Sequence, residues 1–157
     1  MPQFAHLNAA YEGNTSDVRF MPAVWNVTPD GTLPGFRTFY KYSKRTLVPI
    51  IRSSEMYLLA AELSKDLTTA FGHLNKVRIA RGLVALPVGT AATLATEIRK
   101  EYVREFFGEG QLFYYYKRLY IKTITDGSAA NTTTNITMTP AKYVVPIPDD
   151  ELSVHRP

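Results

Sequence analysis

The chain has 157 residues, of which 45% are hydrophobic and 20% charged, and its formal net charge is +4. This length suits a single domain of ordinary globular composition, and no apolar run approaches the ~20 residues that a membrane-spanning helix needs. The sequence contains no cysteine, which excludes disulfides, thiolate metal sites and a cysteine nucleophile.

Residues 1–48 are rich in glycine, proline, threonine and aromatic residues. This composition predicts loops and short strands rather than helix, and the best strand is FRTFYKYS at 36–43 because β-branched and aromatic residues gather there.

Residues 49–125 carry helical periodicity. We expect four helices, from Pro49 to about Lys65, from Leu67 to Arg81, from an N-cap at Thr93 to about Phe107, and from Leu112 to about Ile121. Gly82 stands where the glycine that follows a helix is common. The segment therefore predicts two helix pairs.

Residues 126–157 begin with the small, polar stretch DGSAANTTTNITMT, which predicts a loop over 126–139. The tail YVVPIPDDELSVHRP is expected to start as a strand and to continue as an extended segment set by its prolines. The expected fold class is mainly α with irregular and short β segments, and residues 1–157 are expected to form a single domain.

Charged residues interrupt the apolar faces of three predicted helices. They are Arg52, Glu55 and Glu62 on the first helix, Arg78 and Arg81 on the second, and Glu101 and Glu105 on the third. The apolar faces are expected at Ile51, Met56, Leu59 and Leu63 on the first helix, at Leu67, Ala70, Phe71, Leu74 and Val77 on the second, and at Leu94, Ile98, Tyr102 and Phe106 on the third. Solvated charges should avoid such a face, and burying an unpaired ion costs several kcal/mol. We therefore predict a structural ion-pair network of Arg52, Glu55, Arg78, Arg81, Glu101 and Glu105.

The carboxylates do not indicate catalysis. Glu101, Glu105 and Glu109 line one helical face, and a glycosidase needs two carboxylates. Neighbouring arginines would keep these acids ionised, which favours structural pairing over acid catalysis. The histidines lack convergent partners, and no phosphate loop or catalytic triad spacing is present, so we expect no enzyme, no metal and no cofactor.

Aromatic residues of the first third are the candidates for ligand contact. Trp25, Tyr40 and Tyr42 could offer flat faces to the C–H surfaces of a sugar, and the alternative is that these rings pack the strand region onto the helices. In the run Tyr114–Tyr116 the rings point in three directions around a helix, so at least one should be exposed. Basic residues form no stripe within a recognisable module, so we expect no nucleic-acid partner.

Four sequence blocks resemble one known family. They are IRSSEMYLLAAEL, HLNKVRIARGL, EYVREFFGEGQLFYYYKRL and VVPIPDDEL, in that order between residues 49 and 151. They are similar to the C-terminal part of the SusD/RagB-like outer-membrane nutrient-binding proteins of Bacteroidetes. Tyr115 stands where that family usually has aspartate, and residues 1–48 are similar to it only in character.

The resemblance implies tetratricopeptide-like helix pairs and a surface-exposed lipoprotein of the outer membrane. Such a protein captures a glycan or oligopeptide above a TonB-dependent, SusC-like transporter and cleaves no bond. The lipid-bearing cysteine and the N-terminal helices of the family are not within this sequence. The alternative class is a helical-repeat scaffold that holds a protein partner on its concave face.

Overall fold

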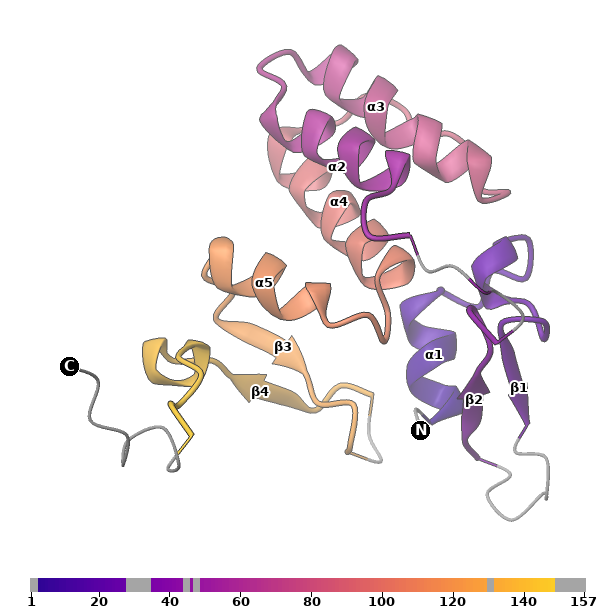
Figure 1. Cartoon of the computed structure of the whole chain (residues 1–157). Helices are drawn as coiled ribbons and strands as arrows, with labels where there is room; N and C mark the ends of the chain where they lie inside the picture. The colour runs from indigo at the N-terminus through magenta and orange to yellow at the C-terminus, as the bar shows by residue number, and fades with distance from the viewer. Residues whose placement is uncertain (1–2, 28–34, 44–45, 47–48, 130–131, 149–157) are drawn as a thin grey trace.

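A computed structural model of the chain describes residues 3–27, 35–43, 46, 49–129 and 132–148 (Figure 1). The described part contains the α-helices α1 (Phe4–Ala10), α2 (Ser53–Leu63), α3 (Leu67–Ala80), α4 (Ala91–Glu105) and α5 (Gln111–Arg118). Strands β1 (Trp25–Val27) and β2 (Arg37–Phe39) form one antiparallel pair, and β3 (Thr123–Thr125) and β4 (Asn135–Thr137) form another. Short 3-10 helices occupy Val18–Phe20 and Pro140–Tyr143. The mainly helical fold class with short strands is confirmed.

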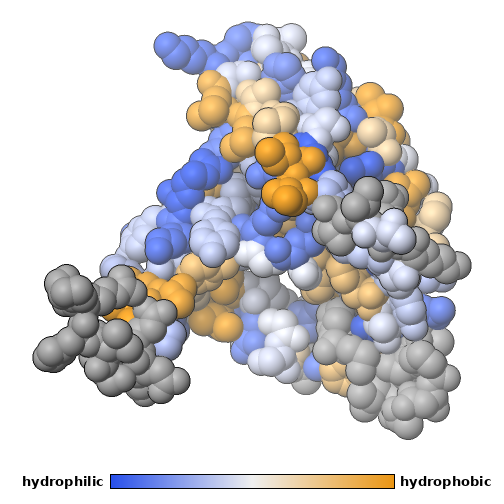
Figure 2. Space-filling view, viewed as in Figure 1, coloured by the Kyte–Doolittle hydropathy of each residue, from blue (hydrophilic) through white to orange (hydrophobic). Residues whose placement is uncertain are grey.

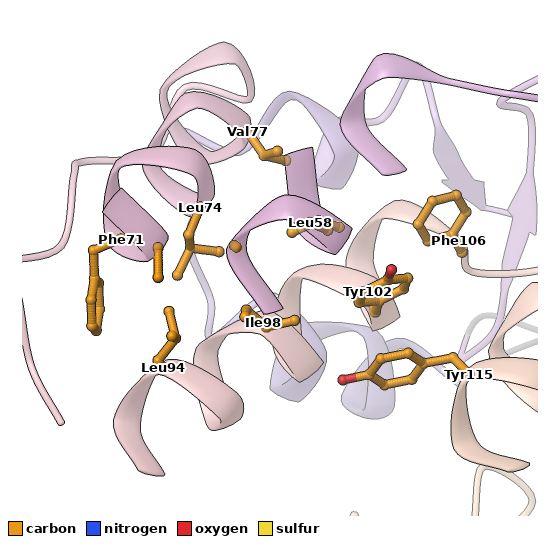
Figure 3. Packing of buried hydrophobic residues seen from close by; sticks show 11 residues of the cluster. Leu58, Phe71, Leu74, Val77, Leu94, Ile98, Tyr102, Phe106 and Tyr115 are labelled. Carbon is orange, nitrogen blue, oxygen red and sulfur yellow. The ribbon is translucent and has the colours of Figure 1, made fainter. Parts of the chain in front are cut away.

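Helices α2, α3 and α4 pack together around the main hydrophobic core. The predicted apolar faces of α3 and α4 are confirmed, because Leu74 and Val77 meet Ile98 and Leu94 in this core (Figure 3). Helix α5 joins the core through Tyr115, whose ring stacks on that of Tyr102 with centroids 4.0 Å apart. This stacking holds α5 beside α4 after the glycine-rich turn that separates them.

The predicted apolar face of the first helix is wrong. Ile51 is 73% exposed and Leu63 is 75% exposed, whereas Ser54, Leu58 and Ala61 are buried. The helix also begins four residues later than expected, because Arg52 has the extended backbone of an N-cap residue. The prediction placed Ile51 inside the helix, and the apolar face that was inferred from it therefore points in a different direction from the face that is buried.

Local capping explains two other helix starts. The carboxylate of Asp66 accepts the backbone N–H of Thr69 at 2.7 Å and so caps α3. The N-cap of α4 is Thr90 rather than the predicted Thr93, since the hydroxyl of Thr90 accepts the N–H of Thr93 at 3.1 Å. The hydroxyl oxygen thus satisfies a free donor of the first helical turn.

The N-terminal region contains a helix that the composition did not predict. Leu7 and Tyr11, one turn apart at α1, are buried together with Trp25 in a second apolar cluster. The expectation that residues 1–48 are not helical is therefore wrong. A seven-residue helix gives too short a periodic pattern to stand out in the sequence.

The C-terminal region also differs from expectation. Strand β4 lies within the predicted 126–139 loop and pairs with β3, which sets Ile124 opposite Ile136. The tail does not start as a strand, because Tyr143 ends a 3-10 helix and its hydroxyl donates to the carbonyl of Ile121 at 2.7 Å. The predicted extended end at 149–157 lies outside the described residues.

Replacing Gly82 or Gly72 by alanine should change the free energy of unfolding in opposite directions. Gly82 has a φ of +82°, and a Cβ there would lie 2.4 Å from the carbonyl oxygen of Ser16. We expect Gly82→Ala to lower the free energy of unfolding by more than about 1 kcal/mol. Gly72 lies exposed inside α3 with open space around it, so Gly72→Ala should raise that free energy by about 0.5–1 kcal/mol. Urea unfolding measures both, and equal effects of the two variants would contradict this prediction.

Candidate functional site

Two carboxylates at the end of α4 lie deep inside the protein. Glu101 is 0% exposed and Glu105 is 1% exposed, and they are one helical turn apart. A buried carboxylate is stable only when charged or strongly polar partners surround it. The partners of Glu101 and Glu105 come from several segments of the chain, which these carboxylates hold together.

Glu101 receives three guanidinium groups from different elements. One of its oxygens accepts from Arg78 of α3 and from Arg104 of α4, each at 3.0 Å. Its other oxygen accepts from Arg19 of the N-terminal 3-10 helix at 2.8 Å. The carboxylate therefore joins the N-terminal region to the helical core.

Glu105 is bound on both oxygens in a similar way. Arg81 donates to them in a two-point contact at 2.9 and 2.7 Å, and Arg19 adds a hydrogen bond at 3.2 Å. The hydroxyl of Ser54 on α2 donates to the same carboxylate at 3.0 Å. The structure thus brings together four of the six residues predicted for a network, namely Arg78, Arg81, Glu101 and Glu105.

Arg19 lies at the centre of this network and was not predicted. It contacts both Glu101 and Glu105, and Asp17 holds it from its own segment at 2.9 and 2.7 Å. Burial would lower the pKa of Arg19, but the hydrogen bond and charge of Asp17 and the charge of Glu101 raise it overall. Arg19 lies in the N-terminal region, separated from α2 by the strand pair β1–β2, so the spacing of residues along the predicted helices could not reveal it.

Arg52 belongs to a neighbouring cluster around Glu109. Its guanidinium lies 2.8 Å from the Glu109 carboxylate, and Lys41 reaches the same carboxylate from the strand region. Arg52 and Lys41 also donate to the backbone carbonyl of Glu105, at 3.2 and 2.6 Å. Arg52 therefore touches the predicted network through main chain rather than through the Glu105 side chain.

Glu55 is the predicted network member that the structure places elsewhere. It is half-buried on α2, and within the described residues it forms no ion pair. The inclusion of Glu55 in the network is corrected by the true rotation of α2, which directs Ser54 toward Glu105 instead.

The partners of Glu105 also set its proton affinity. Burial alone would raise the pKa of this carboxyl, but the hydrogen bond and charge of Arg81, with the charges of Arg19 and Lys41, lower it to about 2. The carboxylate is therefore ionised at neutral pH. A carboxyl held in this state does not act as a proton donor to a substrate.

The three aromatic candidates for ligand contact have different positions. Trp25 is 4% exposed, and its ring centroid lies 4.6 Å from that of Phe39 and 5.0 Å from that of Phe107. It packs the strand pair onto the end of α4, so it offers no open face to a sugar. Tyr40 and Tyr42 are half-buried in the residues after β2.

Three cavities provide the candidate binding surfaces. The largest, about 550 Å³, lies between α1, α4, α5 and the β3–β4 hairpin, and we call it the large cavity. The arginine cavity, about 330 Å³, is lined by Tyr42, Lys41, Arg52 and Arg81 among others. The tyrosine cavity, about 290 Å³, is lined by Glu55 and tyrosines of α4 and α5. Figure 2 shows the molecule hollowed on the side of the large cavity, between the hairpin and the N-terminal region.

Tyr42 is the aromatic candidate that lines one of these cavities. Its hydroxyl donates to Glu109 at 3.0 Å and accepts from Arg52 at 2.7 Å. Tyr40 lines none of the three cavities described above. No group of three or more metal-ligating side chains occurs in the described ranges, and no helix there is long and apolar enough to cross a membrane.

The fold and its cavities define a helical scaffold with concave surfaces of ligand size. The sequence matches the model of the SusD family over residues 38–156, which is more than half of the chain. The chain therefore belongs to the SusD family, and the resemblance to its C-terminal part is confirmed. No curated protein and no solved structure matches the chain. Membership of this family indicates a nutrient-binding role.

Replacing the buried Arg19 should lower the free energy of unfolding far more than replacing an exposed arginine. Arg19→Met leaves Asp17, Glu101 and Glu105 short of a buried partner, so we expect a loss of about 3–5 kcal/mol in the free energy of unfolding. Arg118→Met is the matched control, because Arg118 is 45% exposed in its pair with Glu62 and should lose no more than about 1 kcal/mol. Urea unfolding compares the two, and equal losses would refute the structural role of Arg19.

Acid should weaken the fold through Glu105. Because the pKa of Glu105 is lowered from 4.5 to about 2 by folding, its stabilising contribution is complete above pH 4.5 and is lost as the pH falls toward 2. We expect this group to account for about 3 kcal/mol of lost stability over that interval. The difference between unfolding curves of the native chain and Glu105→Gln isolates it. A pH-independent difference would contradict this assignment.

Proposed function

We propose that the protein is a non-catalytic glycan-binding part of a surface lipoprotein that works with a TonB-dependent outer-membrane transporter. The SusD family supports a nutrient-binding role, and its members are generally surface lipoproteins of the outer membrane. Within this chain, the observation that carries the proposal is the large cavity of about 550 Å³. Ligand sites of proteins commonly enclose about 300–1,000 Å³.

The lining of the large cavity suits a sugar. Its apolar part comes from Val103 and Phe107 near the end of α4 and from Leu112 of α5. Such surfaces pack against the C–H faces of a pyranose, as aromatic and aliphatic side chains do in other binding sites. A glycan can therefore bury its apolar faces against this part of the wall.

Polar groups of the same cavity can meet sugar hydroxyls. Arg99 lies over the ring of Tyr116, with its guanidinium carbon 5.6 Å from the ring centroid, and donates to the carbonyl of Thr123 at 2.8 Å. These contacts fix the guanidinium at the cavity wall. Thr125 of β3 and His6 of α1 also line the cavity, and Nε2 of the His6 ring is hydrogen-bonded with the carbonyl of Ala129 at 2.6 Å.

The paired acids support a binding role without catalysis. Glu101 and Glu105 are held by arginines, and Glu109 is held by Lys41 and Arg52. A hydrolase would need two carboxylates beside an open cleft, one of them able to give up a proton. The three acids of α4 and the turn after it are instead engaged in the fold, which favours capture of a nutrient over its cleavage.

A bulky side chain at the rim of the large cavity should block glycan binding. Thr125 lines this cavity from β3, so Thr125→Trp should raise the dissociation constant for a bound oligosaccharide by about tenfold or more. Thr137→Trp is the control, because Thr137 is exposed in the same hairpin and does not line the cavity. Calorimetric titration with a panel of oligosaccharides measures both variants.

The same samples test the absence of catalysis. No reducing sugar should be released from the panel by the native chain. If no oligosaccharide binds, or if the two tryptophan variants bind equally well, the large cavity is not the glycan site. Release of reducing sugar that Glu101→Gln abolishes would overturn the non-catalytic role.

A further inference from the structure

The tyrosine cavity is lined by side chains of α2, α4 and α5 and is distinct from the arginine cavity. Glu55 and Leu59 of α2 line it on one side. Gln111 and Tyr114 of α5 line it on the other, and Tyr102 of α4 contributes its ring. Neither the arginine network that the structure shows nor the proposed glycan site uses these side chains.

One end of this surface already holds a cation. Arg118 of α5 donates to both carboxylate oxygens of Glu62 on α2, at 2.6 and 2.8 Å. The guanidinium carbon of Arg118 lies 5.7 Å from the ring centroid of Tyr115. A carboxylate from α2 and an aromatic ring from α5 thus bind one positive group between them.

The other end presents the same two kinds of group without a cation. Glu55 precedes Glu62 by two helical turns, so both carboxylates project from the same side of α2. Glu55 is half-buried and forms no ion pair within the described part of the chain, while Tyr114 is 69% exposed. Since Arg118 is neutralised by Glu62, the lining keeps the negative charge of Glu55.

A half-buried carboxylate beside aromatic rings favours a cation over a neutral ligand. The carboxylate has lost part of its hydration, and a positive group restores that interaction more fully than a hydroxyl does. Aromatic rings add a cation–π attraction for the same group. Leu59 offers an apolar surface to the stem that would carry the cation.

We propose that the tyrosine cavity is a second binding site, which takes an organic cation, an ammonium or guanidinium group on an apolar stem. Glu55 pairs with the charge, Tyr114 covers it, and Leu59 contacts the stem. Peptide lysine or arginine side chains carry this chemistry, and so does the ammonium group of an amino sugar. The site is independent of the large cavity, so it does not rest on glycan binding there.

The test is an NMR titration of the 15N-labelled chain with small probes. Nα-acetyl-lysine methylamide and the arginine equivalent should shift the amide signals of α5 at Gln111 and Tyr114. The norleucine equivalent has the same stem without the charge and should bind at least about tenfold more weakly. Glucosamine is compared with glucose in the same way, so that an amino sugar and a peptide side chain are distinguished as sources of the ammonium group.

Two variants, one that tests the site and one that serves as its control, complete the experiment. Glu55→Gln should raise the dissociation constant of the cationic probes by about tenfold or more, since it removes the paired charge. Asp66→Asn makes the same change in net charge while an asparagine keeps the helix cap, and it should leave that constant unchanged. Equal binding of the lysine and norleucine probes, together with equal binding of glucosamine and glucose, would overturn the proposal. Unchanged binding to Glu55→Gln would overturn it as well.

Discussion

The fold depends on the need of two buried carboxylates, Glu101 and Glu105, for positive partners. Their four guanidinium groups come from three places in the sequence, the N-terminal 3-10 helix, α3 and α4. An unpaired ion in either position would cost several kcal/mol, so these segments must stay together for the core to be stable. The backbone agrees with this, because the N–H of Val18 donates to the carbonyl of Arg81 at 3.0 Å and Gly82 lets Ser16 approach closely. The N-terminal region is thereby fixed to the end of α3 by charge and main chain together.

The pairing of these buried acids also distinguishes the residues that stabilise the fold from those that can bind a ligand. The acids at the end of α4 are paired with arginines, and Arg81 and Glu105 of this network line the arginine cavity. We therefore assign ligand binding to the large cavity and the tyrosine cavity. The large cavity combines apolar walls with polar groups, whereas the tyrosine cavity carries Glu55, which forms no ion pair with any described residue, beside aromatic rings. These two linings differ in charge and suit ligands of different chemistry. A nutrient-binding protein of the SusD family can use both without any catalytic group.

The sequence allowed prediction of those features that depend on the regular spacing of residues along a helix. The apolar faces of α3 and α4, and the placement of Arg78, Arg81, Glu101 and Glu105 within them, follow from helical spacing. Arg19 could not be found in this way, since its partners lie 82 and 86 residues further along the chain. Its one local signal is Asp17, which caps the 3-10 helix and pairs with Arg19. The burial of Trp25 was equally hidden, because it depends on Phe39 and Phe107 meeting it in space. Glu55 was misplaced because Ile51, outside the helix, rotated the predicted face of α2.

The most direct test of the buried network is a double-mutant cycle between Arg19 and Glu101. Arg19→Met and Glu101→Gln, singly and together, are compared with the native chain by urea unfolding. If the two side chains stabilise each other across the interface, the double variant should lose less stability than the sum of the single variants, with a coupling above about 1 kcal/mol. Additive losses, within about 0.5 kcal/mol, would show that this contact does not hold the N-terminal region to the helical core.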